Sequence, residues 1–532
     1  MNLVYNVGDK PKFNKLLVFA LQQVLAVMAA TIAVPAIIGL PTQIPAAILG
    51  AGVGTIVYLL FTRFKSPVII SSSFAFLAPL STAIAFGYCG IIVGAILAGL
   101  VYVILAVIIH FAGTKWVSKL MPPVIIGPTV ALIGLSLAGS AMGDIVKANA
   151  SSVNGGYNLV ALLCGLVTFF VVVICSSQKK FKSMRLIPFI IGIGAGYALA
   201  AFFSIFGYAC DADYLKIINW SPIVNNFTPV TVQSFLNYPD FALIEAIKEL
   251  VHGNIGEAIK AANADATLLS GPGFASIALA FIPVAFVVFA EHIADHKNLG
   301  SIIGKDLVEG EPGLKRTLLG DGVGSIAGTV FGICPNTTYG ESVGCVAITR
   351  NASITTIFTA AIMCIVLSFL SPIMAILQTI PSCVMGGVCL TLYGFIAVSG
   401  LKMFKDIDLG DNKNLFTVSA ILIAGIGGLS IKIPYALYKA NVLAPALNDK
   451  GDAIVEVITH YVGEVKSVIT ITAIATALIL GICTYAVCNF IEKKQKESDG
   501  EGDEKVESII TAPVEADSTY DVGESTEAKE EE

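Results

Sequence analysis

Four acidic side chains fall within or at the edge of long apolar stretches of this sequence, at Glu291, Asp295, Asp321 and Glu341. An ionisable side chain at the centre of a bilayer costs about 2.5–3.5 kcal/mol even on a lenient insertion scale, so an acid retained there needs a reason. Glu291 and Asp295 are four residues apart in FIPVAFVVFAEHIADH and share one helical face. Two carboxylates so close disfavour double ionisation, which makes this pair a candidate carrier of a proton.

The chemistry of these groups also indicates a class of ligand. Two carboxylates, with no Lys or Arg in the candidate site, disfavour an anion. A carboxylate accepts hydrogen bonds from N–H groups, and a protonated carboxyl adds one donor beside one acceptor. That edge matches the N–H/C=O edge of a lactam ring, as in uracil or xanthine. Phe74 or Tyr339 would supply the apolar platform that such a ring needs.

Two polar stretches interrupt apolar segments, SSSFAF around Phe74 and NTTYGES around Tyr339. In hydrocarbon, irregular backbone is tolerated only where it is buried in protein or lines a cavity. Each stretch offers free N–H groups at the start of a following half-helix. We therefore expect two broken segments that meet near the midplane of the bilayer with Glu291 beside them, as in the small-molecule sites of transporters.

The elements that must position these residues are apolar helices. Of the 532 residues, 55% are hydrophobic and 13% are charged, whereas a soluble domain carries about 25% charged residues. A bilayer core about 30 Å thick needs roughly 20 apolar residues per helix. The sequence therefore predicts an all-α polytopic membrane protein. About 14 spanning or partly spanning segments are expected, at approximately 14–39, 45–62, 68–87, 90–111, 120–142, 157–176, 187–207, 273–296, 317–334, 338–349, 353–371, 374–400, 414–433 and 467–490.

The two halves of the chain resemble each other. PPVIIGPTVALIGLSLAG in the first half and PSCVMGGVCLTLYGFIAVSG in the second lie at an offset of about 260 residues, as do the two polar stretches, which indicates a duplicated unit. Seven segments are an odd number, so the second copy enters from the opposite side and makes an inverted repeat, as in transporters. Coincidence between apolar segments that contain Pro and Gly is the alternative. The predicted organisation is a first repeat at 1–207, an extracytoplasmic loop at 208–272, a second repeat at 273–490 and a disordered acidic cytoplasmic tail at 491–532.

The distribution of basic residues predicts that both termini are cytoplasmic. In that orientation roughly 24 of the 32 Lys and Arg residues lie on the cytoplasmic side, as the positive-inside rule requires. The first apolar stretch is longer than the core of a signal peptide, so we expect it to be the first span of a multi-pass protein of the cell (inner or plasma) membrane. Part of the 208–272 loop has helical periodicity that is compatible with a position along the membrane surface.

Other classes of protein and partner are less consistent with the residues. No basic stripe interleaves with aromatic residues, so nucleic acid is not an expected partner. The 11 cysteines include no C-x-x-C pair, and neither a metal site nor a disulfide framework is indicated. A metal-dependent membrane enzyme that uses Glu291, His292 and His296 is an alternative, but the order E-H-x-x-D-H is not H-E-x-x-H. A receptor or channel is a further alternative.

The strings SSSFAF, AEHIADH, GDGVGSIAGTVFG and PNTTYGESVGCVAITR resemble the nucleobase–ascorbate transporter (xanthine/uracil permease) family, and its bacterial uracil permease branch most closely. The resemblance runs from about residue 15 to residue 433. It implies a 7+7 inverted repeat in a homodimer, with short β-strands in the third and tenth segments. It also implies a core domain of segments 1–4 and 8–11 and a gate domain of segments 5–7 and 12–14. The implied activity is nucleobase import by proton symport with alternating access, not an enzyme reaction. No cofactor is implied, and the coupling ion is H⁺.

The resemblance also assigns residues by position. The two nucleobase-binding acids of the family match Glu291 and Glu341, and its backbone contacts match Phe74 and Gly340. Two positions depart from uracil permeases, which often carry His where this chain has Asp295 and commonly carry His at the position of Gln23 in the first segment.

These departures bear on the choice of substrate. Purine-transporting relatives also carry an acid in the eighth segment, so Asp295 favours a xanthine or uric acid permease as the alternative. They typically have Gln in place of Glu341, which favours uracil. Asp295, Gln23 and Asp321 are expected to tune the site or couple it to protons. Asp321 is expected at the edge of its span, where access to solvent lowers the cost of its charge. An anion transporter of the same fold is a further alternative, which two acids disfavour.

Overall fold

Helices make up most of the regular structure of the computed structural model, which describes residues 3–148, 157–178, 180, 184, 187–435, 445–447, 453–455 and 467–510. Within these residues, nine helices are long and apolar enough to cross a membrane: Phe13–Ile37, Pro41–Phe61, Gly87–Ala112, Pro123–Asp144, Leu159–Ser177, Pro188–Ala209, Gly273–Ile303, Ser382–Lys405 and Ala473–Gln495. Phe74–Ile84, Ile354–Ser368 and Asn412–Ile426 are apolar but shorter. These helices confirm the prediction of a mostly helical membrane protein.

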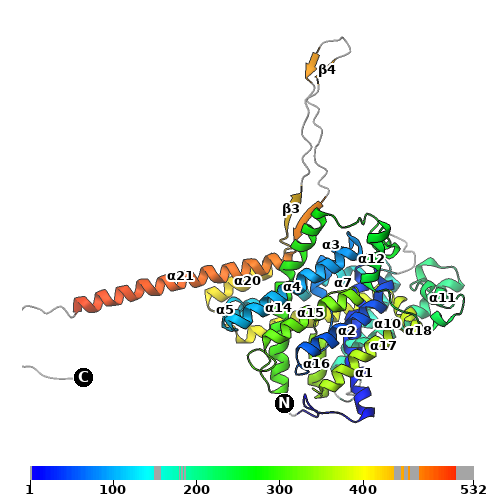
Figure 1. Cartoon of the computed structure of the whole chain (residues 1–532), viewed down its shortest axis with the longest axis horizontal. Coiled ribbons are helices and arrows are strands. Elements are labelled where there is room, and N and C mark those ends of the chain that lie inside the picture. Colours follow the sequence, from blue (N-terminus) through cyan, green and yellow to red (C-terminus); the bar gives the residue numbers. More distant parts are fainter. Residues whose placement is uncertain are drawn as a thin grey trace, which may run out of the picture.

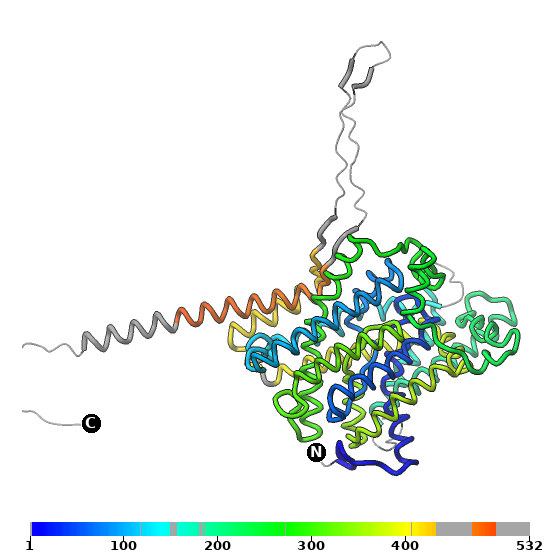
Figure 2. Tube along the Cα trace, viewed as in Figure 1, coloured from blue at the N-terminus to red at the C-terminus, as the bar shows by residue number. Residues whose placement is uncertain are grey.

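The helices of the body pack in two groups. In the first group α15 (Leu314–Phe331) packs against both α2 (Ile44–Phe61) and α4 (Gly87–Ala112), with α1 (Phe13–Ile37), α14 (Gly271–Ile303) and α17 (Ile354–Ser368) around them. The second group contains α6 (Pro123–Ser136), α7 (Ala138–Asp144), α8 (Leu159–Ser177), α10 (Pro188–Ala209), α19 (Ser382–Lys402), α20 (Asn412–Ile426) and α21 (Ala473–Ile510). Figure 2 traces both groups along the chain.

Two short strands interrupt the helices of the first group. β1 (Ile70–Ser72) is followed by η2 (Phe74–Phe76) and α3 (Leu77–Ile84), and β2 (Asn336–Thr338) is followed by α16 (Gly340–Thr349). The strands pair antiparallel, with Ser71 opposite Thr337, and are buried throughout. The two breaks predicted from the polar stretches are therefore present, and they hydrogen-bond to each other.

Four features differ from the predicted segments. The segment at 374–400 consists of α18 (Ser371–Gln378) and α19, which are separated just before the helix-breaking Pro381. Residues 431–435 form β3 and pair antiparallel with β6 (Ser467–Ile471), so two ends predicted as helix are strands rich in β-branched residues. A second hairpin joins β4 (Pro445–Leu447) to β5 (Ala453–Val455). The tail predicted to be disordered from residue 491 continues α21 as far as Ile510, and residues 511–532 lie outside the described part.

The loop at 208–272 is folded onto one end of the body. It contains η3 (Asp213–Leu215), α11 (Ser221–Asn226), η4 (Val232–Ser234), α12 (Ala242–His252) and α13 (Glu257–Ala262), so its predicted helical part is helical. The carboxylate of Glu249 accepts hydrogen bonds from the backbone N–H groups of Tyr88 (2.8 Å) and Gly256 (3.1 Å), which fixes α12 against the start of α4. Burial raises the pKa of Glu249 above its usual value.

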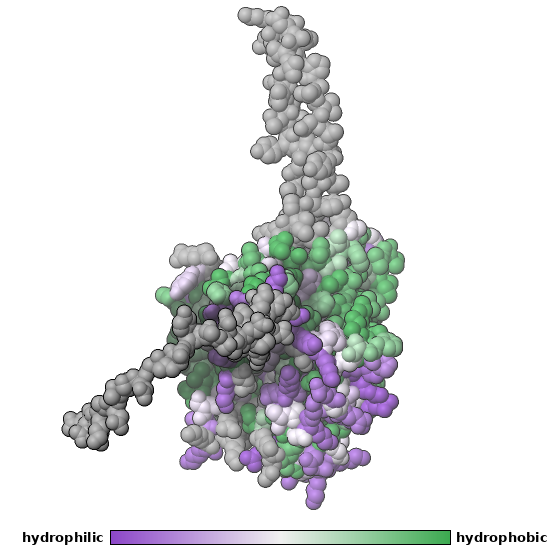
Figure 3. Space-filling model, turned by 90° about the vertical axis from the view of Figure 1, so that its left-hand side faces the viewer, coloured by the Kyte–Doolittle hydropathy of each residue, from purple (hydrophilic) through white to green (hydrophobic). Residues whose placement is uncertain are grey.

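Large apolar side chains are exposed along several helices of the body. Leu100 and Ile104 on α4, Phe170 on α8 and Ile205 on α10 are all more than a third exposed. Figure 3 shows that, on the face drawn, hydrophobic residues gather in the upper part of the body and hydrophilic ones below them. Apolar surface of this extent is unusual in a soluble monomer and is suited to contact with lipid.

Close approach of α2 to α15 requires glycine, which gives a first prediction. A Cβ atom on Gly50 would clash with the backbone oxygen of Gly328, whereas a Cβ on Gly194 of α10 would meet nothing within 4 Å. We expect Gly50→Ala to lower the free energy of unfolding by about 1–3 kcal/mol, the usual cost of overpacking. Gly194→Ala should be neutral or stabilising by up to about 1 kcal/mol. Thermal unfolding of both variants in detergent micelles tests this, and equal melting temperatures would contradict it.

Candidate functional site

The two strands and the turns around them are held together by side chains as well as by their ladder. The hydroxyl of Tyr339 donates a hydrogen bond to the backbone oxygen of Ser72 (2.6 Å), and the backbone N–H of Ser73 donates to that of Pro335 (3.1 Å). Asn336 Nδ2 donates to the backbone oxygen of Gly50 on α2 (2.9 Å). The polar backbone of both breaks is thus paired inside the first helix group, and the starts of η2 and α16 are brought to one place.

Three of the four acids identified in the sequence meet at this place. Glu291 and Asp295 project from α14, Glu341 lies in the first turn of α16, and all three are half-buried. The carboxyls of Asp295 and Glu341 interact electrostatically with that of Glu291. A Cβ atom on Gly340 would lie 3.6 Å from Asp295 Oδ1, so α16 begins directly against this carboxyl. The structure therefore brings Glu291, Asp295, Gly340 and Glu341 together from two helices.

Hydrogen bonds distinguish these acids from one another. Thr338 Oγ1 donates to Asp295 Oδ2 (3.0 Å), which orients this carboxyl toward β2. Among the described residues, Glu291, Asp295 and Glu341 take part in none of the ion pairs. Acids without cationic partners can accept hydrogen bonds from neutral N–H donors or take up protons.

The aromatic residues place the site between the two helix groups. Phe74 is buried, and its ring meets that of Tyr393 on α19 edge to face, with centroids 5.1 Å apart. Tyr339 is also buried, and its hydroxyl is already bonded to Ser72. Tyr393 was not identified from the sequence, because nothing in its local pattern relates it to a residue more than 300 positions earlier in the chain.

Gln23 supports the first turn of α16. Its Oε1 atom accepts a hydrogen bond from Ser342 Oγ (3.0 Å), and Ser342 Oγ in turn accepts one from the backbone N–H of Ile69 (3.1 Å). Gln23 is buried and contacts the residue next to Glu341. Ser342 is a second site residue that sequence reasoning missed.

Asp321 does not lie at a solvent-accessible edge as expected, and that prediction was wrong. Its exposed fraction is 0%, and its Oδ2 atom lies 2.7 Å from His292 Nδ1. The cause is the row of small residues around it, since Gly322 and Gly324 let the backbones of α4 and α2 approach α15 from two sides. Asp321 is therefore enclosed between helices despite its position in the first half of α15.

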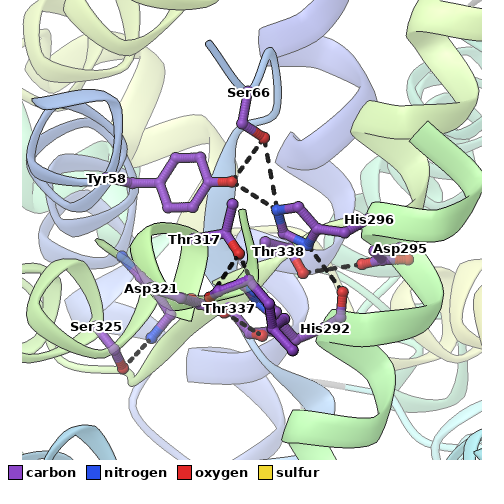
Figure 4. A network of polar contacts seen from close by, with 12 residues as sticks. Tyr58, Ser66, His292, Asp295, His296, Thr317, Asp321, Ser325, Thr337 and Thr338 are labelled. Carbon is purple, nitrogen blue, oxygen red and sulfur yellow. Dashed lines mark hydrogen bonds and ion pairs between the residues drawn. The ribbon is translucent and has the colours of Figure 1, made fainter. Parts of the chain in front are cut away.

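A polar network extends from Asp321 along the face of α14 that carries His292 and His296 (Figure 4). His292 Nε2 lies 3.0 Å from Thr317 Oγ1, and His296 Nδ1 lies 2.8 Å from the backbone oxygen of His292. His296 Nε2 lies 2.8 Å from the hydroxyl of Tyr58 on α2. The sequence identified His292 and His296 only as possible metal ligands, and it gave no signal for Tyr58 or Thr317, which belong to other helices.

Comparison with known sequences matches most of the chain. The model of the xanthine/uracil permeases, described as Permease family, matches residues 14–432. The uracil permease of Bacillus caldolyticus is 35% identical over 433 residues, which cover 81% of this chain and 89% of that protein. The uracil permease of Bacillus subtilis (strain 168) is 34% identical over 443 residues, which cover 83% of this chain and 92% of that protein.

Comparison with solved structures relates the fold to a transporter. The murine solute carrier 26 family member A9 anion transporter, in its inward-facing state, is similar with a TM-score of 0.53. The similarity covers 91% of this chain and 69% of that chain, at 10% sequence identity. At this identity the likeness concerns the fold alone.

The hydrogen bond from the Tyr339 hydroxyl to the backbone oxygen of Ser72 gives a second prediction. Tyr339→Phe should lower the free energy of unfolding by about 1–3 kcal/mol, because it leaves the buried oxygen of Ser72 without this donor. Tyr393→Phe is the matched control, since its hydroxyl is buried without a hydrogen-bond partner among the described residues. We expect the control to melt at or above the temperature of the parent in detergent. A Tyr339→Phe protein as stable as the control would show that the bond contributes nothing.

Proposed function

Because this chain belongs to the xanthine/uracil permease family, we propose that it is a secondary active transporter that imports uracil together with a proton by alternating access. The observation that carries this proposal is the match along most of the chain to proteins named uracil permease. The chemistry of the site supports it, because carboxyls without basic partners suit a neutral ring that offers N–H donors.

Each proposed contact uses a group present at the site. The carboxyls of Glu291 and Glu341 accept hydrogen bonds from the ring N–H groups of uracil. The backbone at Phe74 and Gly340, where η2 and α16 begin, binds its carbonyl oxygens. Phe74 or Tyr339 offers an aromatic surface to the flat ring.

Proton coupling is assigned to the acids of α14. Asp295 lies one turn from Glu291 and interacts with it electrostatically, so the two carboxyls share a proton that travels with uracil. Gln23 and Asp321 act through Ser342 and His292 and tune the site without contacting the ligand.

The architecture follows the same proposal. The chain forms 14 segments in a 7+7 inverted repeat, and the first helix group acts as the core and the second as the gate. Movement of one group against the other exposes the site between them to each side in turn. Two copies form a homodimer in the plasma membrane, with both termini in the cytoplasm, as the distribution of basic residues favours.

A xanthine or uric acid permease is the second candidate, and a specific residue favours it. Asp295 provides a second acid on α14, which the larger ring of a purine would engage. An anion transporter of the same fold is disfavoured because the acids of the site have no cationic partner among the described residues.

Transport itself is the first test of the proposal. Purified protein in liposomes should accumulate labelled uracil when the external medium is acidified, because the proton gradient supplies the driving force. A protonophore should abolish accumulation, and replacement of sodium by choline should leave it intact. Unlabelled xanthine, uric acid, thymine and adenine are added as competitors. Sodium dependence, or stronger competition by xanthine than by uracil, would contradict the proposal.

The variant Glu341→Gln tests whether Glu341 binds uracil or is only a buried acid. A hydrogen bond to a charged group contributes about 1.5–3 kcal/mol, so its loss should weaken uracil binding roughly 10- to 150-fold. Glutamine keeps the shape but turns an NH₂ donor toward the ring N–H, so the change should be nearly as harmful as Glu341→Ala. Calorimetric titration of correctly folded variants measures the effect. Normal uracil binding would show that Glu341 is not a ligand, and a gain of xanthine binding would identify it as the residue that selects pyrimidines.

A further inference from the structure

Helix α12 (Ala242–His252) in the 208–272 loop carries an apolar face that the described part of the protein leaves uncovered. Five large aliphatic side chains on this face are between 43% and 75% exposed: Leu243, Ile244, Ile247, Leu250 and Val251. Their spacing places them on one side of the helix. A helix whose outer surface meets water turns its apolar side chains inward and its polar ones outward. The outer surface of α12 is instead largely apolar.

The next helix of the same loop, α13 (Glu257–Ala262), follows the ordinary rule. Ile259 is buried in it, whereas Glu257 and Lys260 are exposed. Only residues 253–256 separate the two helices. The exposed side of α13 is therefore suited to water, and that of α12 is suited to apolar surroundings.

The other two sides of α12 fix its orientation. The side buried against the body consists of Ala242, Ala246 and Glu249. A third side carries the polar residues Glu245, Lys248 and His252, among which Lys248 Nζ donates to Glu245 Oε1 (2.6 Å). At 100° per residue, the apolar and polar sides flank the buried side and lie about 130° apart. A helix with this division lies along a boundary between apolar and aqueous surroundings.

The attachment of α12 sets its level relative to the bilayer. The carboxylate of Glu249 accepts a hydrogen bond from the backbone N–H of Tyr88, the second residue of α4 (2.8 Å). Helix α4 has 26 residues and is therefore about 39 Å long, whereas the core of a bilayer is about 30 Å thick. Its ends thus reach the headgroup layers, and α12 is held at the level where headgroups meet hydrocarbon.

The apolar surface continues from α12 onto the body. Helix α12 packs against α4 and α15 at the outer edge of the body (Figure 1). The ring of Phe241, just before α12, meets that of Phe331 at the end of α15, with centroids 6.1 Å apart, and Phe331 is itself 44% exposed. Farther along α4, Leu100 and Ile104 are exposed as well. The face on α12 therefore extends the apolar surface that the spanning helices offer to lipid.

We propose that α12 is an interfacial anchor, whose apolar face inserts into the leaflet on the side of the 208–272 loop while its polar side faces water. Lipid of that leaflet is the occupant, because the face lies at the level of the headgroups and continues the lipid-facing surface of α4. The anchor ties this end of the first helix group to the membrane surface. Neither uracil nor a proton takes part in the contact, so it holds whatever ligand the protein transports.

Tryptophan fluorescence of the full chain in phosphatidylcholine vesicles tests this placement. The variant Ile247→Trp adds one indole to the face, and the signal of the parent, which comes from two tryptophans, is subtracted. Lipids brominated near the headgroup should quench the added indole about twofold more strongly than lipids brominated near the chain end, and aqueous iodide should quench it little. A melting temperature equal to the parent's shows that the variant is folded, and Leu250→Trp is a second probe of the same face.

The variant Lys260→Trp is the matched control, because it places the same residue at an exposed position of α13. We expect iodide to quench it and neither lipid to do so, which also shows that an added tryptophan does not draw a loop helix into the membrane. Equal quenching of Ile247→Trp and Lys260→Trp would overturn the proposal, because both would then face the same medium. Protection of Ile247→Trp from iodide and from both lipids would also overturn it, because protein, such as a second copy, would then cover the face.

Discussion

The structure depends on hydrogen bonding of backbone that is not helical inside an apolar body. Two chain breaks would leave unpaired N–H and C=O groups where no water is available, at a cost of several kcal/mol for each group. Here each break supplies the partner of the other, because β1 and β2 form one antiparallel ladder. Tyr339 and Asn336 complete the pairing through bonds to Ser72 and Gly50. The starts of η2 and α16 can then lie side by side without exposing either strand to lipid.

This pairing determines how closely the surrounding helices pack. Asn336 reaches the backbone of α2 only because glycines on α2 and α15 bring the two helices into near contact. The same closeness encloses Asp321, which binds His292 instead of solvent. The rest of the site faces the second helix group, where Tyr393 of α19 meets Phe74. The site therefore lies at the boundary of the two helix groups.

The acids of the molecule divide into two kinds according to their partners. Asp321 is fully enclosed, and its Oδ2 atom lies 2.7 Å from His292 Nδ1, so a histidine is its partner. Glu291, Asp295 and Glu341 are half-buried and have no ion-pair partner among the described residues. Groups of the second kind are available to a ligand or to protons, whereas the first kind acts through its neighbours. Both kinds lie within reach of β2, so one strand connects them.

The sequence by itself determined what depends on local composition and spacing. Long apolar runs predicted the helices, polar interruptions predicted both breaks, and an i, i+4 spacing placed Glu291 and Asp295 on one face. The tertiary structure decided what depends on contact between distant segments. It paired Ser71 with Thr337, buried Asp321 between α2 and α4, and gave His296 its partner Tyr58. No local pattern encodes these contacts, because they arise from the packing of helices far apart in the chain. Glycines, which have no side chain, let these helices approach closely and so decide which residues meet.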